Sequence, residues 1–258
     1  MSDTNQEPNA TKNTIEPGVD TTLGETATDQ EKLSFTSLLF ENIAPDEQHR
    51  LSLILDEFIR GFRFLQQQKK RSVSFFGSAR TDETAPDYLS AQELATRIVT
   101  ELDYSIVTGG GPGIMEAANR GACDADGTSL GLTIQLPKEQ STNPYVKESV
   151  DFHYFFVRKV LLAFSAEAYV FFPGGFGTMD ELFELITLIQ TKKIKQVPIF
   201  LVDHGYWENL DKFIRENLLE RKTISPEDMN IVTITDDMDQ IIETIKNNPL
   251  ERGSEIDA

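Results

Sequence analysis

Short apolar runs alternate with amphipathic stretches over most of the chain. Six runs have the length and composition of buried strands: Val73–Phe76, Ser105–Val107, Ser129–Ile134, Ala168–Phe172, Val197–Val202 and Ile231–Ile234. Helical periodicity fills the intervals near 87–102, 114–123, 158–166, 178–193 and 207–220, and returns at 237–247. Strands separated by helix-length crossovers form parallel sheets that are covered on both faces. The pattern therefore predicts an α/β fold with a doubly wound parallel sheet flanked by helices.

An amphipathic helix is expected before the first strand, from about Asp46 to Gln68. Its apolar residues recur at helical spacing: Leu51, Ile54, Leu55, Phe58, Phe62 and Leu65. This stripe packs either on the α/β domain or on a partner, and the sequence leaves both open. We therefore expect a helical extension over residues 33–70 and the α/β domain over residues 71–248. The longest irregular interval, roughly 135–155, is predicted to be a loop of the kind that contacts or covers a ligand.

Charge and composition restrict the partners of the protein. The 258 residues carry a formal net charge of −18, which disfavours binding to nucleic acids or anionic membranes, because both need clustered Lys and Arg. Residues 1–32 are acidic with almost no aliphatic side chains, so we expect them to be disordered, and we expect a flexible tail at 249–258. The single cysteine, the lack of a signal-peptide pattern and the lack of an apolar run of ~18 residues predict a cytoplasmic protein.

The most informative local pattern is a glycine phrase that occurs twice. Gly-Gly-Pro-Gly-Ile-Met spans 110–115 and Gly-Gly-Phe-Gly-Thr-Met spans 174–179, each after an apolar run and before an apparent helix. Such a turn leaves backbone N–H groups unpaired at a helix N-terminus, which favours an anion. Tight strand–helix turns also use glycine for steric reasons alone. Neither phrase matches the dinucleotide fingerprint or the P-loop motif, and the recurrence predicts a shared pocket for a phosphorylated small molecule.

The expected topology of the sheet predicts where this pocket lies. Three small-residue turns follow predicted strands, at 77–80, 109–113 and 173–178. In an open α/β sheet, ligands lie beyond the carboxyl ends of the strands, where the strand order reverses. We therefore expect the three turns to lie together at that end of the sheet.

Two glutamates follow the glycine phrases, and each has a structural as well as a functional interpretation. Thr178 and Glu181 form the pattern of a capping box, and Glu116 is placed to stabilise the first turn of a helix. A carboxylate repels a phosphate, so beside an anion site it would serve ribose hydroxyls, an attacking water or a developing positive charge. Arg158 either orients the ligand or a catalytic carboxylate, or is a helix residue paired with a surface acid.

The residues around the second phrase resemble those of the LOG ("Lonely guy") family. Residues 173–181, Pro-Gly-Gly-Phe-Gly-Thr-Met-Asp-Glu, match its PGGxGTxxE signature, and Arg158-Lys159 matches its paired basic motif. Residues 109–118 look like its first glycine loop in the form of its longer bacterial members, and the similarity extends from about Ser72 to Ile245. Members of this family are Rossmann-like homodimers or larger assemblies. They hydrolyse the N-glycosidic bond of nucleoside 5′-monophosphates to a free base and ribose 5-phosphate.

The resemblance implies a nucleotide-binding catalytic domain and a role for each matching residue. It makes Arg158 and Glu181 the catalytic pair. The positions expected to bind substrate are Gly77, Ser78, Gly110, Gly111, Gly113, Met115, Glu116, Lys159, Gly174, Gly175, Gly177, Thr178, Asp180 and Thr187. The second glycine loop would hold the phosphate, and the first would border the sugar and base. No cofactor or metal is implied, and the three histidines are too scattered to indicate a metal site.

Two rival functions are weighed against this hydrolase. Similar sequences have carried the label lysine decarboxylase, a chemistry that needs a buried lysine for pyridoxal phosphate. Lys192, Lys193 and Lys195 cluster instead at the end of a predicted helix, which disfavours it. A nucleotide-binding or sensing module without hydrolysis is the second rival, and the intact catalytic pair argues against it. The aromatic segment 152–157 and the N-terminal extension differ from the short plant-type members, so the preferred base, that of AMP or of N6-modified AMP, is left open.

Overall fold

The structure is a computed structural model that describes residues 43–135 and 142–248. The chain divides into two compact units, Met1–Arg50 and Leu51–Ala258. In the first unit, the described residues contain the beginning of helix α2 (Pro45–Gln67), where proline occupies the first helical position and its missing N–H costs nothing. The disorder expected for 1–32 and the flexible tail expected at 249–258 lie outside the described residues.

The second unit alternates strands and helices. Its elements after α2 are β1 (Ser72–Phe76), α3 (Pro86–Leu102), β2 (Ser105–Thr108), α4 (Ile114–Asp124), β3 (Ser129–Ile134), β4 (Glu148–Phe152), α5 (Phe155–Ala163), β5 (Ala168–Phe171), α6 (Phe176–Gln190), β6 (Ile199–Leu201), α7 (His204–Phe213), β7 (Thr233–Ile234) and α8 (Met238–Asn247). A π-helix, η1 (Ile214–Leu219), continues α7, and a 3₁₀ helix, η2 (Pro226–Asn230), precedes β7. The strands of the described residues form one parallel sheet in the order β4-β3-β2-β1-β5-β6-β7, which confirms the predicted fold class.

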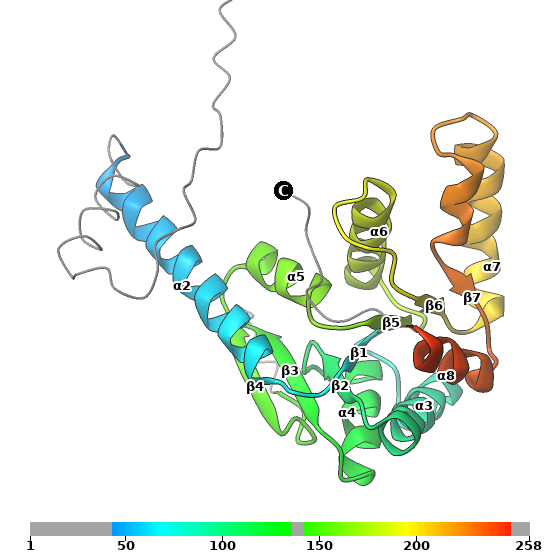
Figure 1. Cartoon of the computed structure of the whole chain (residues 1–258), viewed down its shortest axis with the longest axis horizontal. Coiled ribbons are helices and arrows are strands. Elements are labelled where there is room, and N and C mark those ends of the chain that lie inside the picture. Colours follow the sequence, from blue (N-terminus) through cyan, green and yellow to red (C-terminus); the bar gives the residue numbers. More distant parts are fainter. Residues whose placement is uncertain (1–42, 136–141, 249–258) are drawn as a thin grey trace, which may run out of the picture. The chain divides into compact units, whose positions relative to one another are not determined.

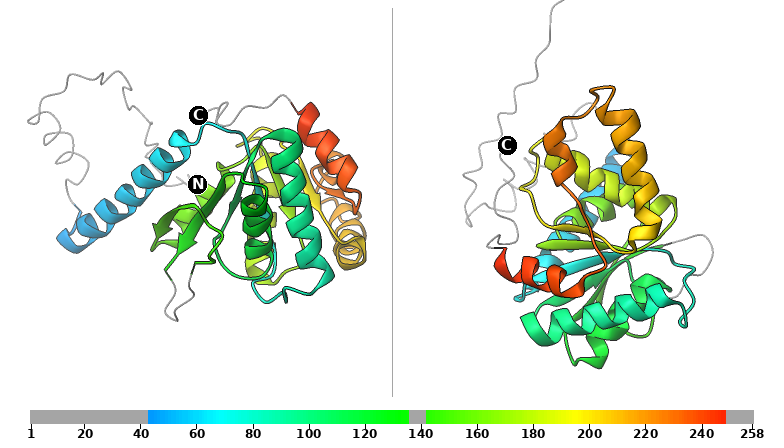
Figure 2. Two further views of the ribbon diagram at one scale, coloured as in Figure 1. Left: turned by 90° about the horizontal axis from the view of Figure 1, so that it is seen from below. Right: turned by 90° about the vertical axis from the view of Figure 1, so that its right-hand side faces the viewer.

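Helices cover both faces of this sheet. Helices α5, α6 and α7 lie on one side, and α3, α4 and α8 lie on the other (Figures 1 and 2). One core cluster includes Ile98 of α3 and Ile241 of α8, and a second includes Leu161 of α5, Leu185 of α6 and Trp207 of α7. Every residue of β1, β2 and β5 is buried, because central parallel strands face a helix layer on each side. This explains why continuous apolar runs marked these strands in the sequence.

The structure corrects the interval that was predicted to be a loop. Residues 148–152 form strand β4, which pairs with β3 at the edge of the sheet. Only Val150 and Phe152 of this strand are buried, so charged residues interrupt the apolar pattern that identified the other strands. The helix expected from 158 begins earlier, at Phe155, and Arg158 therefore lies one turn inside α5 rather than at its start.

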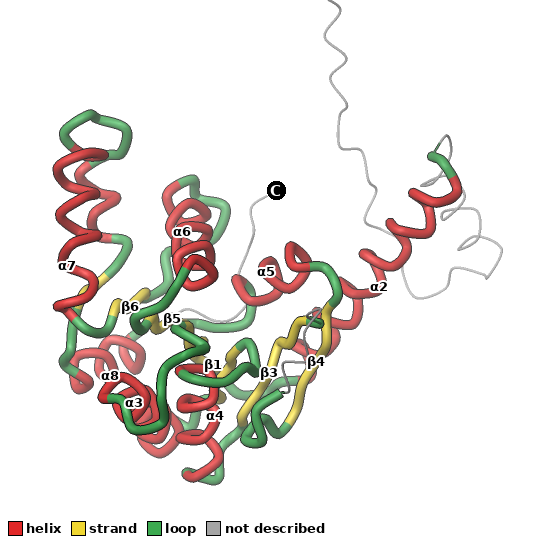
Figure 3. Tube along the Cα trace, turned by 180° about the vertical axis from the view of Figure 1, so that it is seen from behind, coloured by secondary structure: helices red, strands yellow, loops and turns green. Residues whose placement is uncertain are grey.

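The second half of α2 packs on the α/β domain, which was one of the two alternatives that the sequence left open. Leu65 is buried, and a side chain at Gly61 would collide with Leu161 of α5 and contact Phe152 of β4. This part of the helix lies beside β4 (Figure 3). No helix in the described part of the chain combines the length and the apolar character that a membrane crossing requires.

Candidate functional site

Three loops meet at the carboxyl end of the sheet, beside the point where the strand order reverses. Strand β1 lies between β2 and β5, so the loops that follow these three strands are neighbours. Ser78 N donates to the Pro173 carbonyl at 3.0 Å, and Ile114 N donates to the Ser78 carbonyl at 3.1 Å. These bonds confirm that the turns at 77–80, 109–113 and 173–178 lie together.

Three buried polar side chains that the sequence analysis missed hold the first glycine loop. Thr108 Oγ1 accepts from Gly110 N at 2.9 Å and donates to Asn119 Oδ1 at 2.6 Å. Asn143 donates its backbone N–H to Gly110 O and its Nδ2 to Gly111 O, both at 2.9 Å. Asn143 Nδ2 also donates to Asn119 Oδ1 at 2.9 Å. The available signal was an asparagine on the otherwise small, apolar buried face of α4.

The first turn of α4 places Met115 and Glu116 beside this loop. A Cβ at Gly109 would lie 2.9 Å from Met115 Sδ, so the thioether packs against the backbone of the loop. Glu116 Oε1 accepts a hydrogen bond from the Tyr88 hydroxyl at 3.3 Å. Both side chains are half-buried. They therefore border the same edge of the sheet as the loops.

The second glycine loop leaves the amino end of α6 open. The helix begins at Phe176, which is 96% exposed, and its N-cap residue Gly175 provides no side-chain cap. A Cβ at Gly175 or Gly177 would meet no atom within 4 Å. The Tyr206 hydroxyl fixes the loop by donating to Gly174 O at 2.6 Å. Because the first N–H groups of a helix lack intrahelical acceptors and carry the positive end of its dipole, this end can bind a phosphate through its backbone.

Thr178 and Glu181 do not form the capping box that their spacing indicated. The helix begins two residues before Thr178, so neither residue stands at the required position. Thr178 is buried, and its side chain lies so close to Gly174 that any Cβ there would collide with it. The glycines let the helix begin early, which turns Glu181 into a residue of the second turn with no capping function.

Arg158 extends from α5 to strand β3 and to the loop that follows β2. Its Nε donates to the Leu132 carbonyl at 2.8 Å, and its Nη2 lies against Gly109, where a Cβ would collide with it. Burial lowers the pKa of the Arg158 guanidinium, and the charge of Glu181 opposes this effect. Arg158 is therefore a cation directed into the site, which excludes the alternative of a surface arginine paired with an acid.

Glu181 has a perturbed ionisation. Burial raises the pKa of its carboxyl to about 7, although the charges of Arg158 and Lys159 lower it. The neighbouring carboxylates Glu184 and Asp180 add a smaller upward effect. A carboxyl with a pKa near neutrality, beside a half-buried cation, is typical of an acid–base site.

Lys159 is engaged with two carboxylates of α6. Its Nζ lies 2.8 Å from Asp180 Oδ2 and 3.3 Å from Glu184 Oε2. Burial lowers the pKa of Lys159, but the hydrogen bond with Asp180 and the charges of Glu184 and Glu181 outweigh it, so the net pKa is raised. Lys159 is therefore a protonated cation that ties α5 to α6.

Thr187, which was expected to bind substrate, lies away from the loops. It lies nine residues after Thr178 in α6, which is about 13 Å along the helix axis. Its hydroxyl donates to Phe183 O at 2.7 Å. The residue lines a cavity of about 220 Å³ between α6 and the α7–η1 region, whose walls are mainly apolar.

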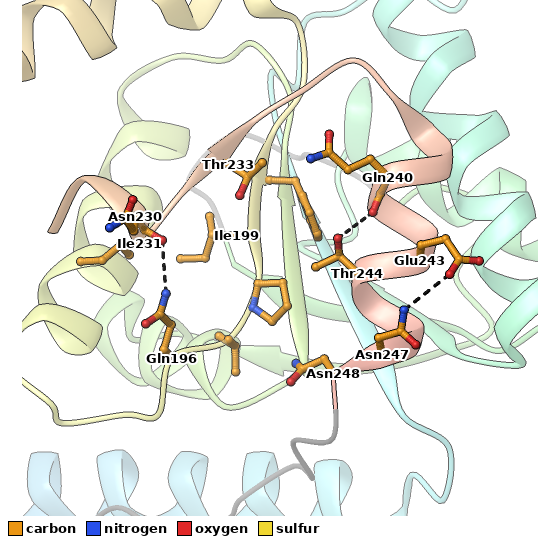
Figure 4. A pocket seen from close by; sticks show the side chains of 13 residues that line it. Gln196, Ile199, Asn230, Ile231, Thr233, Gln240, Glu243, Thr244, Asn247 and Asn248 are labelled. Atoms are coloured by element: carbon orange, nitrogen blue, oxygen red, sulfur yellow. Dashed lines mark hydrogen bonds between the residues drawn. The ribbon is translucent and has the colours of Figure 1, made fainter. Parts of the chain in front are cut away.

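A larger groove, of about 620 Å³, lies away from the three loops. Its lining includes Gln196, Ile199, Thr233, Gln240 and Glu243 (Figure 4). These residues lie around the starts of β6 and β7, which is the opposite end of the sheet from the glycine loops. Its single charged lining residue is a carboxylate, which repels phosphate. The groove therefore lacks the chemistry of a nucleotide site.

Within residues 43–135 and 142–248, no three His, Cys, Asp or Glu side chains are arranged to hold a metal ion. What the loops do assemble is an open helix N-terminus, a half-buried guanidinium and a carboxyl that ionises near neutrality. This set can bind a phosphorylated molecule and stabilise positive charge or remove a proton beside it.

Comparisons with known proteins identify the family of this chain. The family model described as possible lysine decarboxylase matches residues 115–245. A probable cytokinin riboside 5′-monophosphate phosphoribohydrolase of Oryza sativa subsp. japonica is 30% identical over 172 residues, which cover 63% of this chain and 77% of that protein. A cytokinin riboside 5′-monophosphate phosphoribohydrolase of Arabidopsis thaliana is 27% identical over 189 residues, covering 71% and 85%.

Two solved structures have the same fold. The X-ray structure of TM1055 aligns with a TM-score of 0.52 at 22% identity, covering 68% of this chain and 98% of that one. A Moco carrier protein of Chlamydomonas reinhardtii aligns with a TM-score of 0.50 at 25% identity, covering 69% and 96%. The family model matches the segment that carries both the Arg-Lys pair and the second glycine loop. The chain therefore belongs to the LOG family, whose model bears the description of a possible lysine decarboxylase.

Proposed function

We propose that this protein is a nucleoside 5′-monophosphate phosphoribohydrolase that acts on AMP or on N6-modified AMP. The observation that carries the proposal is the interaction between Arg158 and Glu181 beside the open amino end of α6. The names of the phosphoribohydrolase relatives support the same reaction. The products would be the free base and ribose 5-phosphate.

The phosphate would bind at the amino end of α6. The backbone N–H groups from Gly175 to Thr178 are available there, and the glycines at 175 and 177 let an anion approach closely. The net charge of the chain is −18, so most of its surface repels an anion. The positive potential at the amino end of α6 would attract one. The 5′-phosphate would thereby fix the ribose next to Arg158 and Glu181.

The reaction would pass through a positively charged sugar. As the bond between C1′ and the base nitrogen lengthens, its electron pair moves to the base and the ribose acquires oxocarbenium character. The ionised Glu181 carboxylate stabilises this charge and accepts a proton from the water that attacks C1′. The base takes up a proton and leaves, so one water is consumed for each base released. Because ionised Glu181 is the active form, the activity should increase as the pH rises through about 7.

The family description of a lysine decarboxylase does not fit the lysines of this chain. A Schiff base with pyridoxal phosphate requires a lysine that can lose its proton in a buried site. Lys159 is held protonated by two carboxylates, and the other lysines of the described residues are not buried. We therefore propose no decarboxylation.

A panel of nucleotides tests the proposed reaction. The purified protein is incubated at pH 8 with AMP, N6-isopentenyl-AMP and adenosine, and free base is followed by chromatography. We expect base and ribose 5-phosphate in equal amounts from at least one nucleotide, and far less base from adenosine, which lacks the phosphate that α6 would bind.

The same experiment separates the hydrolase from a binding module or carrier, which is the function that the Moco carrier protein has by its name. Thermal stabilisation by AMP with no release of base from any nucleotide would favour a binding module. That outcome would contradict the proposed hydrolysis.

A further inference from the structure

A buried carboxylate outside the three loops connects α2 to the helix that carries Arg158. Glu57 of α2 is 5% exposed. Its Oε1 accepts from His153 N at 2.7 Å, and its Oε2 accepts from Tyr154 N at 3.1 Å. Carboxylates are seldom buried unless they are paired or fully hydrogen-bonded. The two hydrogen bonds therefore compensate the burial of Glu57.

These two amides stand at the start of α5. Tyr154 is the N-cap residue, and its own side chain makes no capping hydrogen bond. Glu57, which lies 96 and 97 residues earlier in the chain, therefore accepts from the N–H of the N-cap residue and from the N–H before it. In a capping box, a glutamate of the helix itself satisfies the N-cap N–H. The negative charge of Glu57 also lies at the favourable end of the α5 dipole.

Further contacts hold α2 in this position. Gly61 allows close packing against Leu161 of α5, and Arg60 Nη1 donates to the Asp151 carbonyl at 3.2 Å, two residues before the capped amides. The carboxylate is thus carried by a helix that is itself fixed to β4 and α5. Arg158 follows one turn after the cap, and its backbone N–H donates to Tyr154 O at 3.2 Å.

We propose that Glu57 is a positioning residue for Arg158, through the hydrogen bonds that fix Tyr154 and the first turn of α5. This inference rests on the proposed function for its catalytic consequence. It makes α2 a part of the catalytic apparatus rather than an appendage of the domain. Without the two acceptor oxygens, the first turn of α5 frays and the guanidinium leaves its place between Leu132 O and Gly109 in a fraction of molecules.

The titration of Glu181 reports this movement without any substrate. The charged groups that face Glu181 are Arg158 and Lys159 of α5 and Asp180 and Glu184 of α6. Burial raises the pKa of Glu181 to about 7, and Arg158 opposes this rise. When Arg158 is displaced, the pKa of Glu181 should increase further. A loss of folded protein alone lowers the amplitude of a signal and leaves this pKa unchanged.

The test compares Glu57→Gln and Glu57→Asp with wild type in the full-length protein. Gln keeps the shape but offers one acceptor oxygen to two donors, whereas Asp keeps the charge on a shorter side chain. Glu47→Gln is the matched control, because Glu47 is an exposed acid of the same helix. Carbon-13 NMR gives the pKa of Glu181, amide hydrogen exchange gives the opening of 153–158, and AMP turnover gives kcat and KM.

For Glu57→Gln we expect faster exchange at 153–158, a higher pKa of Glu181, and a kcat reduced about tenfold with KM changed less than about twofold. Glu57→Asp should recover part of each effect, and Glu47→Gln should match wild type. A Glu57→Gln protein with wild-type exchange, Glu181 titration and kcat would overturn the proposal, and should this variant fail to fold, wild-type values in Glu57→Asp would do so. If the wild type hydrolyses no nucleotide, the proposed function fails, while the exchange and titration still decide the role of Glu57.

Discussion

Glu181→Gln is expected to abolish nucleotide hydrolysis while making the folded protein more stable at pH 8. Glutamine has nearly the shape of glutamate, but it cannot take the proton of water or stabilise a cationic sugar by charge. We expect kcat with AMP to fall by about 10²–10⁴-fold. The kcat of Arg158→Ala should fall by a similar factor. The double variant should have a kcat only slightly lower than either single variant, because the effects of residues that act as a unit are not additive.

The gain in stability follows from the raised pKa of Glu181. Its value of about 7 in the folded state exceeds the ordinary 4.5, so the folded state binds the proton more tightly than the unfolded state. Stability therefore falls as the pH rises from 4.5 through 7, and the full cost is present above 7. Removing the ionisable carboxyl should recover about 1–3 kcal/mol at pH 8 and about a quarter of that at pH 5.

Urea unfolding at pH 5 and pH 8 measures this effect, with Glu243→Gln of α8 as the control for a carboxylate that is 65% exposed. Arg158→Ala should not share the gain, because it removes the cation that favours the ionised form of Glu181. Wild-type turnover in either folded site variant would contradict the assignment of the catalytic pair. Equal stability of Glu181→Gln and wild type at pH 8 would contradict the raised pKa of Glu181 in the folded protein.

Gly113→Ala is expected to disrupt the site and the fold together. Gly113 has φ of +67° and ψ of −129°, a conformation that L-residues avoid. A Cβ there would collide with the Ser78 carbonyl and with the backbone of Ala79. The collision has no easy relief, since Ser78 O also accepts from Ile114 N and Ser78 N is bound to Pro173 O.

Strain and collision together should cost about 2–4 kcal/mol and lower Tm by roughly 5–15 °C. Turnover should also fall, because the three loops share these hydrogen bonds. Gly205→Ala in α7 is the matched control, as the added Cβ would meet only Asp203 Oδ1, at 3.4 Å. Thermal unfolding of both variants decides the point: a Gly113→Ala protein as stable as Gly205→Ala would show that the loops tolerate a side chain at this position.

The sequence was most informative where burial is complete. Runs such as Ser129–Ile134 predicted central strands because both faces of those strands meet a helix layer. The meeting of three turns was predictable in turn, because parallel strands bring their carboxyl ends to one edge. Strand β4 was missed because an edge strand with three exposed residues out of five has no continuous apolar run.

Other parts of the site depend on contacts that periodicity cannot show. Glu57 looks like any acid on an amphipathic helix, and only the packing of α2 at Gly61 reveals its burial. Asn143 lies in an interval without a regular pattern, yet it holds the first glycine loop. The true start of α6 at Phe176 also escaped prediction, because the glycines permit an early beginning of the helix that the capping-box spacing did not indicate.

The most direct test of the single nucleotide site is a crystal structure of the Glu181→Gln variant with AMP. We predict the phosphate at the amino end of α6, bonded to backbone N–H groups near Gly177 and Thr178, and the ribose next to Arg158. The base should lie toward Met115. AMP bound in the groove between Gln196 and Gln240, or with its phosphate away from α6, would contradict the proposed site.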